Sequence, residues 1–412
     1  MRPLLRKTLP GLGLLMILQS CSSDGVGPSD PITELPRDLT LAEVEVIGRS
    51  NSFGFQLLKE VEALRDGAHP NTVLSPLSAT MALGMALEGT DGETFTSMRD
   101  ALGFQGLLRE EVNASYRGLL DLLPELDPEV EVSIANSAWA REAFPFHSTY
   151  FDAVSTYFDA EVRELDFGAP GAKDIINGWV REETNGRIEE IVETITPLDI
   201  LFLINAVYFK GNWTTRFDRD DTRPSTFELA SGERVNVPTM KAEDLPISLA
   251  NVAGVQIGEL PYGGGAFSLV VAIPSPGQKV DELVAGLDDS AWAAWMSALR
   301  EDTLPVSLPK FELEWDGKLN DALKAMGMEL AFQQEADFSR MTPAPDAHIS
   351  RVKQKTYMKV DEEGTEAAAA TSVAISLTSM PMGFYVDRPF VVAIRERLSG
   401  TILFLGVIRD PR

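Results

Sequence analysis

The chain is poor in the residues that most often carry catalysis and metal binding: its 412 residues include one cysteine and three histidines. The single cysteine, Cys21, excludes a disulfide within the chain, and no Cys or His spacing matches a metal site. The sequence also lacks a Gly-x-Ser-x-Gly nucleophile elbow and a His-Glu-x-x-His zinc motif. We therefore predict that the protein is not an enzyme and holds neither a metal nor another cofactor.

Basic residues are scarce beside acidic ones: 36 lysines and arginines stand against 62 aspartates and glutamates, a net charge of −26. This charge argues against binding of nucleic acids or of anionic membrane surfaces. Solubility is its plainest consequence, and attraction of basic partner proteins is a second. The run Gly263-Gly264-Gly265 lacks the spaced glycines and the lysine of a phosphate loop, so we expect a tight turn there.

The N-terminal segment is typical of a targeting signal. Arg2, Arg6 and Lys7 precede an apolar run at residues 9–18, which is too short to cross a bilayer as a helix. The next residues, Leu18-Gln19-Ser20-Cys21, resemble a bacterial lipobox, which implies cleavage before Cys21 and lipidation of that residue. An ordinary secretory signal with a chance cysteine is the alternative. Residues 22–40 are rich in Pro, Gly, Ser and Asp, as flexible tethers are.

These features predict three parts: a signal peptide of the lipoprotein type at residues 1–20, lipidated Cys21 with a flexible tether at 21–43, and one domain at 44–412. The protein would then be exported and held by its lipid alone, on an outer membrane, facing the periplasm or the exterior. Ser22 in place of Asp after the cysteine favours that membrane. If Cys21 is not lipidated, we expect a secreted protein.

Helical and strand-like patterns alternate along the domain without a repeating strand–helix rhythm, so the predicted class is α+β. One or two helices are expected at residues 41–61, and another at 73–87, where Ser75 suits a cap and Pro76 a first turn. Further helices are expected at 175–192 with a break at Asn185-Gly186, at 292–296 and at 319–330. Strands are expected at residues 129–140, 201–210, 267–274, 304–313 with interruptions at two prolines, and at 391–394 and 401–407, joined by a hairpin at Ser399-Gly400.

Residues 361–378 fit more than one conformation. Four alanines, Ala367 to Ala370, follow Gly364 and several glutamates, and alanine favours helix. The second half, from Thr371, is rich in β-branched residues, which favour strand, and no proline interrupts until Pro381. A segment that can be an exposed loop or a strand is a candidate conformational switch.

Several separated motifs resemble the serpin family from about residue 44 to the C-terminus. Asn71 to Ser78, with Ser75-Pro76 inside, is similar to the family's entrance to a central helix. The other matching segments are residues 176–188, Asn205 to Trp213, Glu362 to Ala370, Asp387-Arg388-Pro389-Phe390 and Phe404-Leu405-Gly406. The resemblance implies a single-domain fold with a large, mainly antiparallel central sheet, further sheets, about nine helices and an exposed reactive-centre loop at residues 362–385.

The resemblance also implies a monomeric suicide-substrate inhibitor of serine proteases. A protease attacks the loop, and the loop then inserts into the central sheet and carries the acyl-enzyme with it. The family's spacing places the reactive bond at Thr378–Ser379, with Leu377 or Met380 as alternatives. A small, uncharged Thr378 favours elastase-like or subtilisin-like targets, and the alternatives favour chymotrypsin-like ones. The competing interpretation is a non-inhibitory serpin-fold binding protein at the cell surface.

The resemblance implies a hinge that consists of Glu362, Glu363, Gly364, Thr365, Glu366, Ala367, Ala368, Ala369 and Ala370. On insertion, alternate residues would face the core, namely Thr365, Ala367, Ala369, Thr371 and Val373. None of these is charged or large, which favours inhibition. The implied shutter and breach residues are Ser75, Ser78, Asn205, Trp213 and Gln354. Gln354 replaces the family's shutter histidine and can also donate and accept hydrogen bonds.

Overall fold

A computed structural model describes residues 31–65, 67, 69–365 and 383–412. Cys21, residues 366–382 and the predicted reactive bond lie outside these ranges. Nine α-helices form within them, and none is long and apolar enough to span a membrane. The helices are α1 (Leu41–Ala63), α2 (Pro76–Glu88), α3 (Gly92–Ala101), α4 (Arg109–Leu122), α5 (Ser148–Phe158), α6 (Ala172–Glu183), α7 (Val280–Ala285), α8 (Asp289–Ala298) and α9 (Asn320–Leu323).

The strands form three sheets, and most of their pairs are antiparallel, which confirms the predicted α+β class. The largest sheet has the order β1-β15-β14-β8-β7-β6-β9-β13, with β5 on β6. Its strands are β1 (Thr72–Leu74), β5 (Arg223–Glu228), β6 (Arg234–Val252), β7 (Val255–Tyr262), β8 (Phe267–Ile273), β9 (Arg300–Pro309), β13 (Phe384–Tyr385), β14 (Phe390–Glu396) and β15 (Ile402–Ile408).

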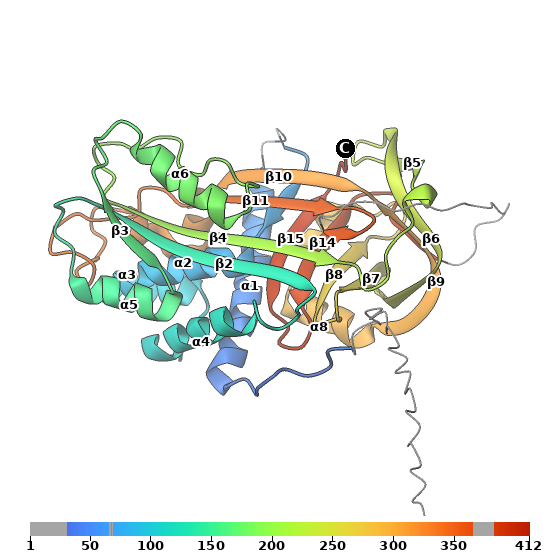
Figure 1. Ribbon diagram of the computed structural model, residues 1–412, viewed down its shortest axis with the longest axis horizontal. Coiled ribbons are helices and arrows are strands. Elements are labelled where there is room, and N and C mark those ends of the chain that lie inside the picture. Colours follow the sequence, from blue (N-terminus) through green and yellow to red (C-terminus); the bar gives the residue numbers. More distant parts are fainter. Residues whose placement is uncertain (1–30, 66, 68, 366–382) are drawn as a thin grey trace, which may run out of the picture. The chain divides into compact units, whose positions relative to one another are not determined.

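The remaining strands form two smaller sheets that run side by side along the molecule (Figure 1). One has the order β12-β4-β2-β3 and the other pairs β10 with β11. Their bounds are β2 (Val130–Arg141), β3 (Glu161–Leu165), β4 (Leu201–Asn212), β10 (Phe311–Lys318), β11 (Lys353–Val360) and β12 (Gly364–Thr365). Within the described ranges, β4 and β11 do not pair with each other, and only the two-residue β12 adds to the free edge of β4.

Four predicted elements differ from the structure. The helix expected over residues 73–87 begins at Pro76 with Ser75 as its cap, as expected for those two residues, but Thr72–Leu74 forms a strand that pairs with β15. The helix expected at 175–192 ends at Glu183, before the break at Asn185-Gly186, and residues 184–192 form no helix. The strand expected at 304–313 ends at Pro309, while Pro305 stays inside β9, at a bulge where the ladder to β6 is interrupted. The helix expected at 319–330 is irregular after α9, because Gly327 has φ of 102°.

The other expected elements form as predicted. The 41–61 pattern is a single helix, α1, which begins with a capping box between Thr40 and Glu43. The triglycine run is a tight turn in which the Gly265 N–H donates to the Tyr262 carbonyl at 2.7 Å. The strands at 129–140, 201–210 and 267–274 correspond to β2, β4 and β8, and the C-terminal hairpin to β14 and β15.

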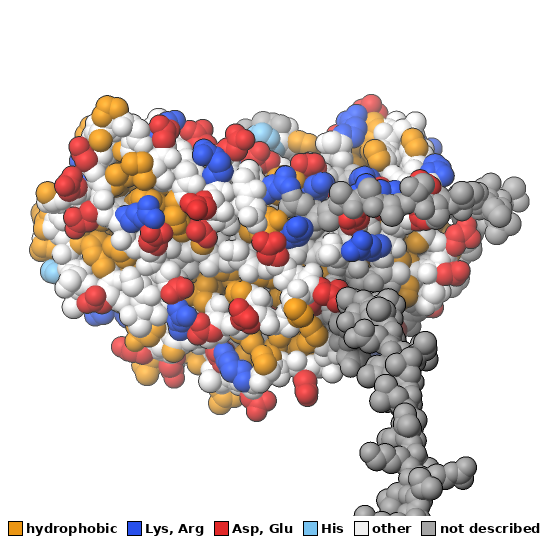
Figure 2. Space-filling model, viewed as in Figure 1, with side chains coloured by type: hydrophobic (Ala, Val, Ile, Leu, Met, Phe, Trp, Pro, Cys, Tyr) orange, Lys and Arg blue, Asp and Glu red, His pale blue; other side chains and the backbone are white. Residues whose placement is uncertain are grey.

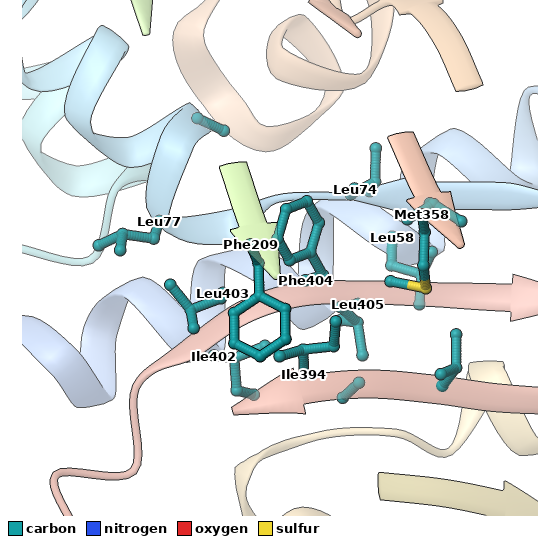
Figure 3. Close-up of a cluster of buried hydrophobic side chains, with 14 of the residues drawn as sticks. Leu58, Leu74, Leu77, Phe209, Met358, Ile394, Ile402, Leu403, Phe404 and Leu405 are labelled. Atoms are coloured by element: carbon teal, nitrogen blue, oxygen red, sulfur yellow. The ribbon is translucent and has the colours of Figure 1, made fainter. Parts of the chain in front are cut away.

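One hydrophobic core underlies both smaller sheets. Figure 3 shows Phe209 of β4 and Met358 of β11 on the same cluster as Leu403, Phe404 and Leu405 of β15. A second, smaller cluster lies on the opposite face of β4, where α6 packs with its buried Ile176 and Val180. Side chains of β4 therefore pack against described residues on both faces of the strand.

Candidate functional site

The hinge is a tight reversal of the chain at the end of β11. Asp361 and Gly364 form an antiparallel bridge, so Glu362 and Glu363 occupy the turn between them. The chain then returns as β12, with Gly364 opposite Asn212 and Thr365 opposite Gly211 on β4. The described part of the hinge is thus already in the position of a strand beside β4.

Gly364 is required by this reversal. Its φ is 143°, a conformation that residues with a Cβ rarely adopt. A Cβ on Gly364 would also lie 2.0 Å from the Gly211 carbonyl oxygen. The glycine therefore permits both the turn and the close approach of the two backbones.

Trp213 and Tyr262 form the breach around the first hinge strand. Their rings stack with centroids 4.5 Å apart and an interplanar angle of 10°. The Trp213 indole N–H donates to the Asp361 carbonyl at 2.8 Å, and the Trp213 backbone N–H donates to the Glu363 carbonyl at 2.8 Å. The Tyr262 hydroxyl lies 3.0 Å from the Thr365 hydroxyl. Burial raises the pKa of Tyr262, so this hydroxyl stays neutral at physiological pH.

Glu362 and Glu363 are clamped by side chains from other elements. Lys310 donates to Glu362 at 2.8 Å and the Thr222 hydroxyl donates to its other oxygen at 2.6 Å. Arg219 donates to Glu363 at 2.6 Å. Burial raises the pKa of Glu362, but the hydrogen bonds from Lys310 and Thr222 outweigh it, and the net pKa is lowered. The turn is therefore held as a charged, buried structure.

Gln354 joins the start of α2 to β11. Its side-chain oxygen accepts from the Ser75 backbone N–H at 3.0 Å, and its amide nitrogen donates to the Ser75 carbonyl at 2.9 Å. The Ser75 hydroxyl donates to the Leu403 carbonyl at 2.7 Å and accepts from the Ser78 backbone N–H at 3.3 Å. Both functions of the glutamine amide are therefore in use.

Asn205 belongs to a different set of contacts. Its amide nitrogen donates to the Asn136 side chain at 2.7 Å, and Asn136 donates in turn to the Phe158 carbonyl. The Asn205 side-chain oxygen is buried and has no hydrogen-bond partner among the described residues. The structure thus brings Ser75, Ser78 and Gln354 together, and leaves Asn205 with an unused acceptor on the core face of β4.

The far end of the loop is fixed at β13. Phe384 is fully buried and lies over Gly258, where a Cβ would meet its ring at 2.6 Å. Phe384 and Tyr385 pair in parallel with Val306 and Ser307 of β9. Residues 366–382 therefore connect two fixed ends. The predicted hinge residues Glu366 to Ala370, the reactive bond Thr378–Ser379 and the alternatives Leu377 and Met380 all fall in that undescribed segment.

Sequence reasoning missed the side chains that clamp the hinge. Tyr262, Lys310, Thr222 and Arg219 lie far from residue 362 in the chain. Asn136, the partner of Asn205, was missed as well, and it lies outside the hinge. One sequence feature could have pointed to Tyr262, because this residue directly precedes the triglycine run, where a turn was predicted. Within the described ranges, no group of three His, Cys, Asp or Glu side chains could hold a metal ion.

Comparisons with known proteins agree with this geometry. A family model described as Serpin (serine protease inhibitor) matches residues 48–411. An uncharacterized serpin-like protein of Thermococcus kodakarensis is 36% identical over 403 residues, covering 93% of this chain and 91% of the relative. The native structure of tengpin, a thermophilic serpin, has a TM-score of 0.80 and 29% identity, covering 93% of this chain and 97% of that chain. Human thyroxine-binding globulin has a TM-score of 0.81 and 26% identity, covering 90% and 99%. The chain belongs to the serpin family.

Proposed function

We propose that this protein is a suicide-substrate inhibitor of serine proteases, whose segment 366–378 inserts between β4 and β11 after a protease attacks it. The observation that carries the proposal is the position of β12. Gly364 and Thr365 already pair with the edge of β4 that faces away from β2, and the turn at 362–363 ties them to the end of β11. Continued growth of β12 would join the two smaller sheets into one.

Two registers support this pathway independently. On one side, Thr365 pairs with Gly211, so an extended β12 would place residue 367 opposite Phe209 and residue 369 opposite Val207. On the other side, the bridge of Asp361 to Gly364 would place the same two residues opposite Met358 and Thr356. Phe209 and Met358 are buried in the main core and Thr356 is buried too. Both registers therefore direct Ala367 and Ala369 to the core.

Small side chains suit this position. Phe209 and Met358 already lie on the cluster formed with β15 (Figure 3), so the residue between them must be small. Alanine loses little side-chain entropy on burial and adds no polar group. A large or charged residue there would have to displace well-packed neighbours or be buried without a partner. The inward set deduced from the sequence thus fits the geometry of the two flanking strands.

The same registers place Thr371 between Asn205 and Gln354. The Asn205 side-chain oxygen is buried and lacks a partner among the described residues, so a hydroxyl donor from Thr371 would satisfy it. A satisfied buried acceptor stabilises the inserted form relative to the native one. The orphaned acceptor therefore supports insertion of the segment at least as far as Thr371.

Incubation with elastase, subtilisin and chymotrypsin tests the proposal. We expect at least one covalent complex that survives denaturing electrophoresis, and a released C-terminal fragment that begins at Ser379. A fragment that begins one or two residues away would move the reactive bond to Leu377 or Met380. Clean cleavage by all three proteases without a complex would instead favour the non-inhibitory binding protein, a use compatible with the likeness to thyroxine-binding globulin.

The place of action is part of the proposal. Arg2, Arg6 and Lys7, the apolar run and the lipobox-like Leu18 to Cys21 support export and a lipid anchor in a bacterial host. Expression of the full chain in a bacterium would then yield a membrane-bound, acylated protein, and Cys21→Ala would abolish the acylation. A full chain whose mature form is soluble and unmodified would contradict the anchor and leave a secreted inhibitor.

A further inference from the structure

We propose that Lys210 of β4 and Lys359 of β11 form a binding site for one carboxylate on the inserting strand, and that this site selects an acidic residue at position 366. The inference rests on the proposed function and deepens it, because it names residues that guide the first step of insertion. Glu366 lies outside the described residues, so the site is argued from the two lysines and from the strand registers.

The registers lead directly to these two lysines. Thr365 pairs with Gly211, and an antiparallel strand that continues by one residue meets Lys210 next. On the other side, Asp361 pairs with Gly364, so the residue that follows Thr365 falls opposite Lys359. Position 366 is therefore flanked by a lysine on each neighbouring strand.

Both lysines belong to the outer face of their strands. Lys210 follows Phe209, which points into the main core, and alternates with it along β4. Lys359 lies between Met358 and Val360, which are both buried, and its own side chain is 28% exposed. This outer face also carries α6, and Figure 2 shows basic side chains gathered over β10 and β11 on it. On insertion, the side chain of residue 366 would lie on this outer face, between Lys210 and Lys359.

The neighbouring strands complete a row of alternating charge. Glu131 of β2 is the cross-strand partner of Lys210, and Glu312 of β10 is the partner of Lys359. The row across the sheet thus reads acidic, basic, position 366, basic, acidic. Opposite charges at directly facing positions stabilise a sheet, and like charges destabilise it. An acidic residue is the one type that gives every neighbouring pair opposite signs.

Lys359 keeps capacity for a second carboxylate. Its ammonium lies 3.4 Å from the Asp361 carboxylate, and an ammonium has three hydrogen-bond donors. Position 370 offers a contrast, because its flanking residues are Ala206 and Lys355, and only one of the two strands then provides a lysine. A carboxylate at position 370 would gain much less, so the preference is specific to position 366.

Peptide annealing tests the site without a protease. An acetylated peptide of residues 366–378 and its Glu366→Gln version would be incubated with the uncleaved protein in low salt. The rate is measured as growth of a heat-stable fraction. We expect the Gln peptide to anneal about three- to fivefold more slowly, as two partly exposed ion pairs predict. In the Lys210→Gln, Lys359→Gln double variant both peptides should anneal at one rate, whereas Lys355→Gln should keep the difference.

The possible outcomes distinguish failure of the lysine site from failure of the proposed function. Equal rates for the two peptides with the unmodified protein would overturn the lysine site and leave insertion intact. A difference that persists in the double variant would overturn it as well, because another group would then bind the carboxylate. If neither peptide anneals, the space between β4 and β11 does not accept a strand, and the proposed function fails together with the site.

Discussion

At the scale of single residues, Gln354 makes the contact between β11 and Ser75 without a group that titrates near neutral pH. Its amide binds both the N–H and the carbonyl of Ser75, so the junction of β11 with α2 is satisfied. A histidine could not make these two bonds in all protonation states, and it would titrate near neutral pH. The glutamine keeps the link independent of pH.

We therefore predict that loop insertion carries no histidine-type pH dependence from position 354. The insertion rate of the unmodified protein should stay flat between about pH 5.5 and 7.5, where imidazole titrates. Gln354→His should introduce a dependence in that range, which stopped-flow fluorescence of Trp213 can follow. A pH-dependent rate in the unmodified protein that disappears in Gln354→Ala would contradict the prediction.

Glu362, unlike Gln354, stabilises its surroundings through a charge that depends on pH. Its pKa is lowered in the folded protein, with hydrogen bonds from Lys310 and Thr222 outweighing the effect of burial. A carboxyl group with a lowered folded pKa adds stability that is fully present above its unfolded pKa, about 4.3, and is lost as pH falls through the folded value. The clamp on the turn should therefore hold at neutral pH and open in acid.

We predict that acidification below about pH 4 lowers the unfolding temperature of the uncleaved protein, because protonation of Glu362 weakens the clamp on the turn. Glu362→Gln should be less stable than the unmodified protein at neutral pH by about 1.5 kcal/mol, the lower end of the range for a hydrogen bond to a charged group, since Lys310 is partly exposed. Thermal unfolding as a function of pH measures the effect. The variant should also lose part of the acid response, and an unchanged response would assign it to other carboxylates.

At the scale of elements, local pattern predicted most helices and strands, and long-range contacts decided the exceptions. Apolar periodicity was sufficient for α1 and β2, and near-continuous apolar runs were sufficient for β4 and β8. Thr72 to Leu74 became a strand because β15 offers it an edge, a contact that lies more than 300 residues away in the chain. The segment at 361–371 was ambiguous from propensity, and the structure resolves its described part: Gly364 and Thr365 form a strand on β4.

Thr365 is the β12 residue whose side chain enters the core. It is buried, and its hydroxyl lies 3.0 Å from the buried Tyr262 hydroxyl. We predict that Thr365→Arg turns the inhibitor into a substrate, because an unpaired charge would have to be buried at a cost of several kcal/mol. Thr365→Ser, which keeps the hydroxyl, should remain inhibitory. The fraction of protease trapped per cleaved chain measures the effect, and an arginine variant that still traps protease would refute this role for β12.

At the scale of the whole molecule, the central feature is a sheet in two parts that share one core. Motifs in the sequence predicted the family, since they are local and ordered along the chain, whereas the position of the reactive bond stays a prediction. They could not reveal the clamp on Glu362 or the row of charge across β2, β4, β11 and β10, because these depend on registers between distant strands. Among the described residues, β12 covers only the end of this β4 edge, and the proposed function requires that the native state is not the most stable one available to this chain.

The unfolding temperature before and after cleavage of the loop tests this account most directly. A protease that cuts within residues 366–382 without being trapped would free the segment to insert between β4 and β11. A gain of about 5–10 kcal/mol from the added strand would raise the unfolding temperature by roughly 6–12 °C, since an unfolding entropy of about 2.1 cal/mol/K per residue amounts to about 0.9 kcal/mol/K for 412 residues. We predict such a rise in the unmodified protein and a much smaller one in Thr365→Arg. A cleaved protein that melts at the same temperature as the native one, or lower, would contradict a metastable native state and the proposed function with it.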